Sequence, residues 1–508
     1  MISIMRSGAQ NKEMAERPCC KTLVAEHFRV FLICLLAVMA LTITGCATVG
    51  PNYERIEAQA PAAWHTELQG GVSVGQTTAA ELADWWTVLQ DSQLASLEER
   101  AITGNLDLKE AQARIREARA MRGVSQAGLF PTLAAEAVAS KSGSSASSGT
   151  GAERDVYAVG FDAGWELDIF GGVKRSVEAA QANLEVAQED QHDLLVSLLA
   201  EVALNYVEVR SYQSRLEVSR ANISTQQESY DLNRSRQQAG IIGELAVQES
   251  LRILETSRSL LPTLETGLEA AKNRLALLLG ELPGQLHEEL EIKHPLPSLP
   301  ISIVVGIPAE TLRRRPDVRR AERNVALQTA RIGVATADLY PKFRLFGSLG
   351  LEALSVGDLF QATSKTWGIG PAASWKVFDA GAVRRNIEAQ NARHEQALIQ
   401  YESTVLRALE DVENALFAYA KEQARRDSLN KAAVAAERAE ALAREQYQAG
   451  LVNFNNVLDA QRSLLVLRDE LVRSEAAIIS NLIRLYKALG GGWISAMTDQ
   501  ELGQAETP

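Results

Sequence analysis

One unusual stretch occurs twice in the chain: residues 165–175 read WELDIFGGVKR, and residues 375–385 read WKVFDAGAVRR. The same offset of 210 residues continues on both sides without a gap, and it joins Asp107 with Asp317, Pro131 with Pro341, Gly240 with Gly450, and Gly280 with Gly490. Two similar copies therefore span residues 104–280 and 314–490. Solenoid repeats have periods of about 20 to 50 residues. The much longer period here predicts two large structural halves that arose by duplication.

Each copy contains a long stretch without helix-breaking residues. Residues 173–239 and 382–449 contain neither Gly nor Pro and are rich in Ala, Leu, Glu, Gln and Arg, which favour helix. At about 1.5 Å per residue, each stretch predicts a helix of about 100 Å. Alternating spacings of three and four residues separate the apolar residues Leu195, Leu199, Val202, Tyr206 and Val209, and likewise Val405, Leu409, Val412, Leu416 and Tyr419. This pattern indicates packed helices rather than isolated ones.

Both predicted helices end at a glycine, and another helical pattern follows at once. The two turns are Ala239-Gly240-Ile241 and Ala449-Gly450-Leu451. Because a Gly after a long helix favours a left-handed cap, each copy is predicted to form a helical hairpin with a tight turn. The return helices should run to the end of each copy. Pro262 and Gly267 should interrupt the first of them, so the two hairpins should not be equivalent.

Ahead of each long helix, the apolar period changes from helical to alternating. Residues 156–165, VYAVGFDAGW, and 366–375, TWGIGPAASW, place apolar side chains on one face and small or polar ones on the other. Alternating stretches from residues 133 and 343 complete a hairpin in each copy. Aromatic residues at the ends of an apolar stripe are typical of membrane barrel strands, and an ordinary soluble hairpin is the alternative. The residues expected to face lipid are Tyr157, Val159, Phe161, Trp367, Ile369 and Trp375.

Two hairpins provide four strands, which are too few to close a membrane barrel, since known examples have at least about eight. The chain is therefore expected to share strands with copies of itself, and three protomers would provide about twelve strands around a lumen. The expected fold class is mainly α with a membrane β-barrel. More fully, it is a trimer with four strands per protomer in a shared twelve-stranded barrel and a long α-helical barrel that continues from the strands. The repeated opening stretch would then mark the two places where a membrane strand becomes a long helix.

The N-terminal region indicates where the molecule resides. A mostly apolar run at residues 30–43, VFLICLLAVMALTI, is too short to span a bilayer as a helix and is typical of a signal peptide. The following ITGC resembles the bacterial lipobox, in which the cysteine becomes the acylated first residue of the mature chain. We therefore expect a covalent lipid on Cys46, the last of the four cysteines. Residue 47 is Ala, whereas lipoproteins kept at the inner membrane typically carry Asp there. The expected location is the outer membrane, with a lipid anchor and an extension into the periplasm.

These observations predict a domain organisation in which each copy contains a helix, a strand hairpin and a long helical hairpin. The expected segments are the lipoprotein signal peptide (1–45), a lipidated N-terminal segment with the first helix (46–103), repeat 1 (104–280), a linker (281–313), repeat 2 (314–490) and a C-terminal tail (491–508).

Charge and motif spacing exclude several functional classes. Removal of residues 1–45 leaves 47 Lys and Arg against 61 Asp and Glu, a net charge of −14. An acidic chain without a clustered basic arm argues against a nucleic-acid partner. The two His of HEELEIKH, residues 287–294, are seven apart rather than at a zinc-ligand spacing, and no phosphate-loop spacing occurs. We expect no enzymatic activity, no metal site and no cofactor besides the lipid on Cys46.

Several motifs together resemble one known family. CATVGPNY from residue 46, LRRRPDVRRAERNV from 312, VATADLYPKF from 334 and YQAGLVNFNNVLDAQRSLL from 447 are similar to the outer membrane efflux lipoproteins of the TolC type, in the NodT branch. The resemblance implies a homotrimeric channel-tunnel, with twelve strands above a long α-helical periplasmic barrel. It implies that this channel is the exit duct of a tripartite resistance-nodulation-division pump that exports small molecules such as drugs. It implies a periplasmic adaptor and an inner membrane transporter as partners. It also places the adaptor contacts at the two hairpin tips, that is, at Ala239, Gly240, Ile241, Ala449, Gly450 and Leu451.

Two alternatives belong to neighbouring classes. A type I protein secretion channel of the outer membrane shares the expected architecture. A periplasmic adaptor or scaffold lipoprotein also contains helical hairpins, but an adaptor of the usual kind has one hairpin flanked by small β domains. Two hairpins, each preceded by an amphipathic strand pair, favour the channel. The exported compound cannot be read from the chain, because a duct contacts its cargo only in passing.

A periplasmic gate is the last expectation. Toward the tip of the second long helix, the heptad positions that follow Tyr419 become polar, at Arg426, Glu437, Glu440 and Arg444. Polar groups in place of an apolar seam indicate helices that can separate at low energetic cost. The resemblance places a closing constriction at the same end of these helices. A solvated, charge-rich helix face is the alternative. The candidate gate residues are Glu437, Glu440 and Arg444.

Overall fold

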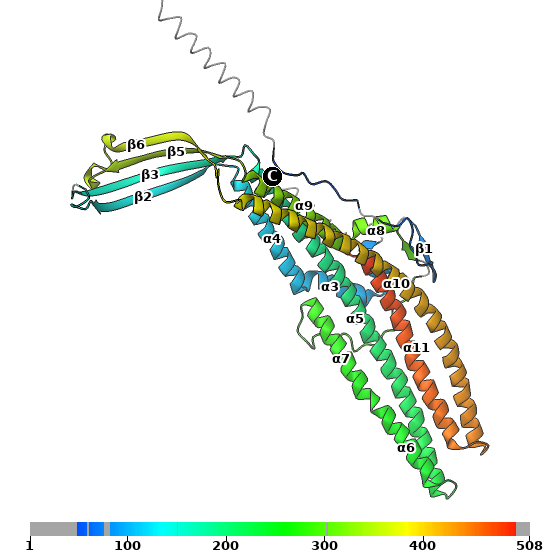
Figure 1. Ribbon diagram of the computed structural model, residues 1–508. Helices are drawn as coiled ribbons and strands as arrows, with labels where there is room; N and C mark the ends of the chain where they lie inside the picture. The colour runs from blue at the N-terminus through cyan, green and yellow to red at the C-terminus, as the bar shows by residue number, and fades with distance from the viewer. Residues whose placement is uncertain (1–47, 58–59, 76–81, 150, 301–302, 494–508) are drawn as a thin grey trace, which may run out of the picture. The chain divides into compact units, whose positions relative to one another are not determined.

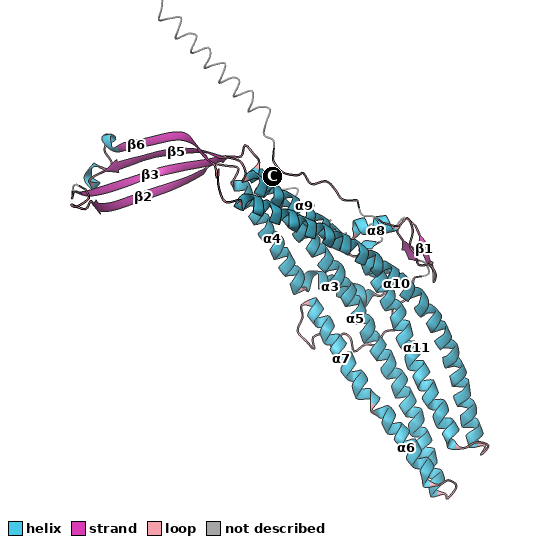
Figure 2. Ribbon diagram, in the orientation of Figure 1, coloured by secondary structure: helices cyan, strands magenta, loops and turns pink. Residues whose placement is uncertain are grey.

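A computed structural model describes residues 48–57, 60–75, 82–149, 151–300 and 303–493 (Figure 1). These residues form two compact units. The first contains Gly128–Arg175 and Gly333–Val383 together with residues 48–50, and the second contains Pro51–Ala127, Ser176–Ile332 and the chain from Arg384 to residue 493. Figure 2 shows that one sheet holds most of the strand residues and that the other long elements are helices. The predicted segment boundaries of the chain stay predictions, and Cys46 lies outside the described residues.

The first unit is built around a four-stranded antiparallel sheet. Its strands are β2 (Thr132–Gly143), β3 (Glu153–Leu167), β5 (Lys342–Ala353) and β6 (Lys365–Ser374), in the order β2-β3-β5-β6. The short 3₁₀ helices η2 (Val356–Asp358) and η3 (Ala362–Ser364) lie in the connection between β5 and β6. Each strand therefore pairs with the next strand of the same sheet in chain order, and β2 and β6 are the two edges of the described sheet.

The repeated stretch that follows each hairpin starts a long helix by a different capping contact in each copy. At the start of α5 (Gly172–Gln238), the Asp168 carboxylate accepts hydrogen bonds from the backbone amides of Val173 and Lys174, at 3.0 and 2.7 Å. At the start of α10 (Ala382–Gln448), Asp379 accepts from the amides of Gly381 and Val383, both at 2.9 Å. A carboxylate satisfies the unpaired amides of a first helical turn in both cases. The two aspartates are not equivalent under the 210-residue offset.

The two long helices match the prediction from composition and spacing. Each contains 67 residues, which corresponds to about 100 Å. The predicted apolar seam is buried: Leu199, Val202 and Tyr206 of α5 are 0% exposed, and Val412 and Tyr419 of α10 are 0% and 2% exposed. Most of the seam packs into the main core of the second unit, whereas Val405 belongs to a smaller cluster and Leu409 is only partly buried. Packing of this kind supplies most of the stability of helices in proteins.

The two return helices differ, as expected, but for only one of the two predicted reasons. The second hairpin returns as one helix, α11 (Phe454–Ala488), whereas the first returns as α6 (Glu244–Arg258) and α7 (Leu260–Leu279). The break at Ser259 lies three residues before Pro262, whose ring nitrogen cannot donate to the carbonyl of Arg258. The prediction for Gly267 was wrong, because Gly267 lies inside α7. A Cβ there would come within 2.5 Å of the Tyr212 ring, so glycine permits close packing of the two helices.

The rest of the second unit surrounds this core. It contains η1 (Trp85–Leu89), α3 (Ser92–Gly104), α4 (Leu106–Ala127), α8 (Pro308–Arg314) and the first part of α9 (Pro316–Ala337). A short parallel pair joins β1 (Val72–Val74) to β4 (Ile303–Val305). Within the described residues, no helix combines the length and apolar character needed to cross a bilayer.

Candidate functional site

The register of the sheet brings the predicted lipid-facing residues of different strands onto one face. Phe161 of β3 lies opposite Leu349 of β5, which lies opposite Trp367 of β6. Residues directly opposite in antiparallel strands point to the same face, so these three side chains share it. All are exposed within the described chain, at 56%, 63% and 77%. The adjacent row contains Asp162, Ser348 and Gly368, so the other face is polar or small.

The remaining predicted lipid-facing residues follow the same alternation, with one exception. Tyr157 and Val159 are on the apolar face of β3, and Ile369 is on the apolar face of β6. Trp375, which was predicted as a strand residue, lies one position beyond the end of β6. Its indole nitrogen donates to the carbonyl of Leu339 at 3.0 Å. The equivalent indole of Trp165 donates to Leu129 at 2.9 Å, so both copies hold a tryptophan at the end of the sheet. Contact of these residues with lipid stays a prediction.

The first described residues after Cys46 and Ala47 are fixed to the start of α5, within the first unit. The guanidinium of Arg175, which is 3% exposed, donates to the carbonyls of Val49 and Gly50 at 3.1 and 3.2 Å. The Val49 amide donates to the carbonyl of Phe170 at 3.1 Å. These contacts place Val49 and Gly50 beside the connection between the end of β3 and the start of α5.

The two hairpin tips have the same backbone geometry. Gly240 and Gly450 adopt φ of 73° and 75°, in the left-handed region. The amides of Ile241 and Leu451 each donate back to the carbonyl five residues earlier, at 2.9 Å, which closes a Schellman cap on α5 and α10. Ile241 and Leu451 are 70% and 76% exposed, and Ala239 and Ala449 are exposed beside them. Each tip therefore presents apolar side chains on a fixed turn.

The candidate gate residues contact other helices of the same chain. Arg444 of α10 forms an ion pair with Glu228 of α5 at 2.9 Å, which joins the two long helices. Glu437 pairs with Arg468 of α11 at 2.9 Å, and Glu440 accepts a longer hydrogen bond from Gln461 of α11 at 3.4 Å. All these polar side chains are at least partly exposed except that of Gln461. Their role as a gate stays a prediction.

Sequence reasoning missed the contacts of the extended N-terminal segment of the second unit. Tyr53 donates to Glu322 of α9 at 2.8 Å, and burial together with this hydrogen bond raises the pKa of Tyr53. The Trp64 indole donates to the carbonyl of Gly306, and the amides of His65 and Thr66 donate to Glu413 of α10. These partners are more than 200 residues apart in the chain, and no local pattern signals such pairs.

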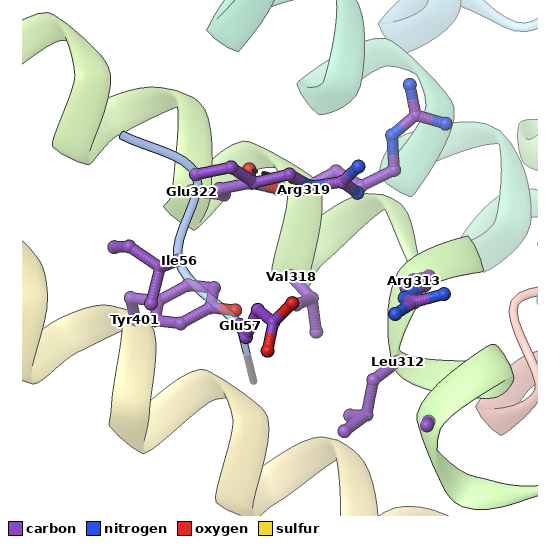
Figure 3. A pocket seen from close by; sticks show the side chains of 10 residues that line it. Ile56, Glu57, Leu312, Arg313, Val318, Arg319, Glu322 and Tyr401 are labelled. Atoms are coloured by element: carbon purple, nitrogen blue, oxygen red, sulfur yellow. Dashed lines mark ion pairs between the residues drawn. The ribbon is translucent and has the colours of Figure 1, made fainter. Parts of the chain in front are cut away.

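A small cavity lies beside this segment (Figure 3). It has a volume of about 160 Å³, and its lining includes Ile56 and Glu57 of the segment, Leu312 of α8, Glu322 of α9 and Tyr401 of α10. The Glu322 carboxylate already accepts from Tyr53 and pairs with Arg55 at 3.6 Å and Arg323 at 3.1 Å. The polar atoms of Glu322 are thus used within the chain. No group of His, Cys, Asp and Glu suited to a metal ion occurs among the residues that the structure describes.

An amphipathic sheet with two open edges, combined with two long helical hairpins, defines the class of outer membrane channel proteins. A family model described as outer membrane efflux protein matches residues 97–281 and 307–491, two segments that are themselves offset by 210 residues. The chain belongs to the outer membrane efflux protein family. It is therefore an outer membrane transport component and not an enzyme. The expected fold class and the outer membrane location are confirmed, whereas the lipid anchor stays a prediction.

Individual relatives cover nearly the whole chain. Nodulation protein T of Rhizobium leguminosarum bv. trifolii is 32% identical over 467 residues, which cover 89% of this chain and 96% of that protein. The cation efflux system protein CusC of Escherichia coli K12 is 30% identical over 462 residues, which cover 89% of this chain and 98% of CusC. The solved structure of the outer-membrane channel OprN has a TM-score of 0.82 at 35% identity and covers 88% of this chain and 100% of OprN. The open state of the Neisseria gonorrhoeae MtrE outer membrane channel has a TM-score of 0.74 at 28% identity, with 88% and 99% covered.

Proposed function

We propose that three copies of this chain assemble into a channel through the outer membrane that serves as the exit duct of a tripartite efflux system. The two open edges of the sheet are the main observation that supports this proposal. Strands β2 and β6 each have one neighbour within the described chain, so one side of each strand offers unpaired backbone groups. In hydrocarbon, every unpaired amide or carbonyl costs several kcal/mol, and only closed sheets avoid this cost.

The number of strands supports three copies. Closed membrane barrels have at least about eight strands, and about twelve leave room for a lumen. The apolar face that carries Phe161 and Trp367 suits the lipid, and the face that carries Asp162 and Ser348 suits a water-filled interior. The two faces thus have the chemistry that the outside and the inside of a channel require.

The hairpin tips support docking of a periplasmic adaptor that links the duct to an inner membrane transporter. Ile241 and Leu451 expose apolar surface on hydrogen-bonded turns. A Cβ built on Gly240 or Gly450 would meet no atom within 4 Å beyond the glycine and its two chain neighbours, so the tips are open. An apolar helical tip of this kind suits a complementary helical hairpin of the adaptor. Loss of the apolar side chain in Leu451→Asp should reduce efflux and leave the assembled channel intact.

A covalent lipid on Cys46 forms part of the proposal. The sequence ITGC supports acylation of this residue, and the contacts of Val49 and Gly50 with Arg175 support a position near the end of the sheet. At that depth an acyl chain can enter the bilayer beside the strand ends, where Trp165 and Trp375 lie. Aromatic residues of membrane proteins favour this interfacial level.

The cargo is proposed to be small molecules selected elsewhere in the system. Related proteins carry names that refer to cation, toluene and solvent efflux, at similar identities to this chain. Such variety among relatives supports a passive duct whose substrate is chosen by the pump.

Two measurements test the proposal. Light scattering of the purified, lipidated protein in detergent should give the mass of three chains. In cells, deletion of the gene should increase susceptibility to small toxic compounds, and the wild-type chain should restore resistance. A stable monomer, or full resistance without the protein under conditions in which its gene is expressed, would overturn the proposal.

A further inference from the structure

Residues 48–50 lie in a cradle between the start of α5 and α9. The cradle is formed by Gly171, Arg175 and Gly333. Its closest contact joins two glycines, since a Cβ on Gly50 would lie only 2.5 Å from the Cα of Gly333. The Arg175 guanidinium donates to the carbonyls of Val49 and Gly50. The cradle thus holds a peptide backbone by two carbonyls and requires glycine at the closest contact.

The duplication provides the same three residues a second time. The offset of 210 residues relates Gly171 to Gly381, Arg175 to Arg385, and Gly333 to Gly123. Each pair has the same residue type. The backbone at the helix start is also alike, because Gly171 and Gly381 adopt φ of 75° and 86°. The second set therefore has the groups that bind a peptide backbone in the first.

The second set has no occupant among the described residues of the chain. A Cβ on Gly381 or Gly123 would meet no atom within 4 Å beyond the adjoining residues. The Arg385 side chain is 80% exposed and pairs with Glu388 of its own helix, whereas Arg175 is 3% exposed. Glycine inside a helix such as α4 is less stable than alanine, and close approach of another backbone is a usual reason for it. No such backbone reaches Gly123 in the described chain.

Assembly of three copies brings the second set together. Helix α10 follows β6 as α5 follows β3, and α4 precedes β2 as α9 precedes β5. In the proposed trimer, α10 of one copy is therefore next to α4 of the neighbouring copy. The trimer contains three filled cradles within chains and three equivalent cradles between copies. Three copies supply only three segments of residues 48–50, so the cradles between copies are open to another protein.

We propose that each cradle between copies binds the N-terminal segment of another lipoprotein, with glycine four residues after its acylated cysteine. This inference rests on the proposed trimer and adds a partner that the efflux function does not require. The occupant follows from repeat 1, where Gly50 lies four residues after Cys46. Arg385 donates to two carbonyls of the partner, and Gly123 of the neighbouring copy contacts the partner's glycine.

A short segment is enough for this interaction, because the partner's lipid holds it in the same membrane. Confinement of both molecules to one surface raises the effective concentration of the segment at the cradle. The cradle also lies beside the strand ends, where an acyl chain can enter the bilayer. The acyl chain and the peptide segment can therefore bind together.

The test uses the full-length trimer in lipid vesicles and a synthetic lipopeptide as the probe. The probe is the acylated sequence of residues 46–53, CATVGPNY, with photoreactive leucine in place of Val49. After illumination, digestion and mass spectrometry, saturable labelling should map to the start of α10 near Gly381 and Arg385. The matched probe carries Gly50→Val. It should label at least about tenfold less, because a side chain there would clash with the opposing glycine.

Three variants of the protein test the cradle itself. Arg385→Ala should lower labelling at least about tenfold, because it removes two hydrogen bonds from a charged donor. Arg384→Ala removes the same charge one residue away and should label as the wild type does. Gly123→Gln should abolish labelling. Glutamine favours helix and meets no atom within the described chain at this position, so α4 should fold, and light scattering verifies that each variant is a trimer.

Each outcome bears on the inference or on the assembly. Equal labelling by the two probes, or equal labelling of Arg385→Ala and Arg384→Ala, would overturn the inference. Labelling confined to the start of α5 would show that the probe displaces the chain's own segment, and this too overturns it. Absence of saturable labelling in a verified trimer would show that the neighbouring copies close the cradle themselves, with the same consequence. A wild-type mass of one chain instead refutes the proposed function.

Discussion

Replacement of Phe161 by arginine should destabilise the assembled channel in the membrane. Phe161 is the ninth of the fifteen residues of β3 and lies on the apolar face, so its side chain is expected near the bilayer midplane. An arginine on the lipid face costs about 2 to 4 kcal/mol at that depth, or about 6 to 12 kcal/mol for three copies. Per chain, this cost corresponds to roughly a 30- to 1,000-fold loss in the equilibrium constant for folding.

The matched variant is Asp162→Arg, which places the same side chain one residue further along on the opposite face. Asp162 is exposed and lies opposite Ala134 and Ser348, so an arginine there can reach the water-filled lumen. Gly160→Arg is a poor comparison although it shares that face. A Cβ at Gly160 would lie 2.9 Å from the Leu349 carbonyl oxygen and 3.0 Å from the Gly350 Cα, so any side chain would disturb the β3–β5 pairing itself.

The assay folds both variants into lipid vesicles and measures the fraction of trimer against urea concentration. Phe161→Arg should shift the midpoint to lower urea or prevent assembly, and Asp162→Arg should remain close to the wild type. Equal destabilisation by the two substitutions would refute the assignment of the faces.

Three further predictions concern the anchor, the gate and a buried acid. Cys46→Ser should abolish labelling by radioactive fatty acid while trimers persist, because four strands per copy already hold the protein in the membrane. Glu440→Ala with Arg444→Ala should raise single-channel conductance in planar bilayers and sensitise cells to large antibiotics, because it removes the contacts of α10 with Glu228 and Gln461. Glu98 is 0% exposed, and burial raises its pKa well above the ordinary value. Wild-type stability should therefore fall as the pH rises above the ordinary pKa of a glutamate, whereas Glu98→Gln should lack this component.

Each of these predictions has a control and a contradicting result. Fatty-acid labelling that survives in Cys46→Ser would exclude this residue as the lipid site. For the gate, Arg385→Ala with Glu388→Ala removes an exposed ion pair near the other end of α10 and should leave conductance unchanged. Unchanged conductance in the assembled Glu440 and Arg444 double variant would rule out these residues as a gate. For Glu98, stability falls with rising pH because the unfolded chain loses the proton near the ordinary pKa while the folded chain retains it. Thermal melts with the same pH dependence for wild type and Glu98→Gln would contradict that explanation.

The amino-acid sequence by itself determined the repeat, the two long helices, their turns and the alternating strands. These features depend on local properties, namely helix propensity, apolar period and the conformational freedom of glycine. The residues that determine each feature lie within a few positions of it in the sequence. The 210-residue offset also identified equivalent positions before any contact was known. The turns at Gly240 and Gly450 and the strand face that carries Phe161 could be predicted for this reason.

Only the tertiary structure decided how distant residues meet. The buried guanidinium of Arg315 contacts Asp317, Asp411 and the carbonyl of Ala488, which joins the start of α9 to the middle of α10 and the end of α11. No local pattern predicts these partners. Strand register and the tight fit of Gly267 against Tyr212 likewise depend on packing geometry. A periodic pattern predicts which face of a helix or strand is buried. The identity of the partner depends on close packing and paired hydrogen bonds among residues far apart in the chain, because many partners can satisfy the same pattern and only one arrangement fills the space.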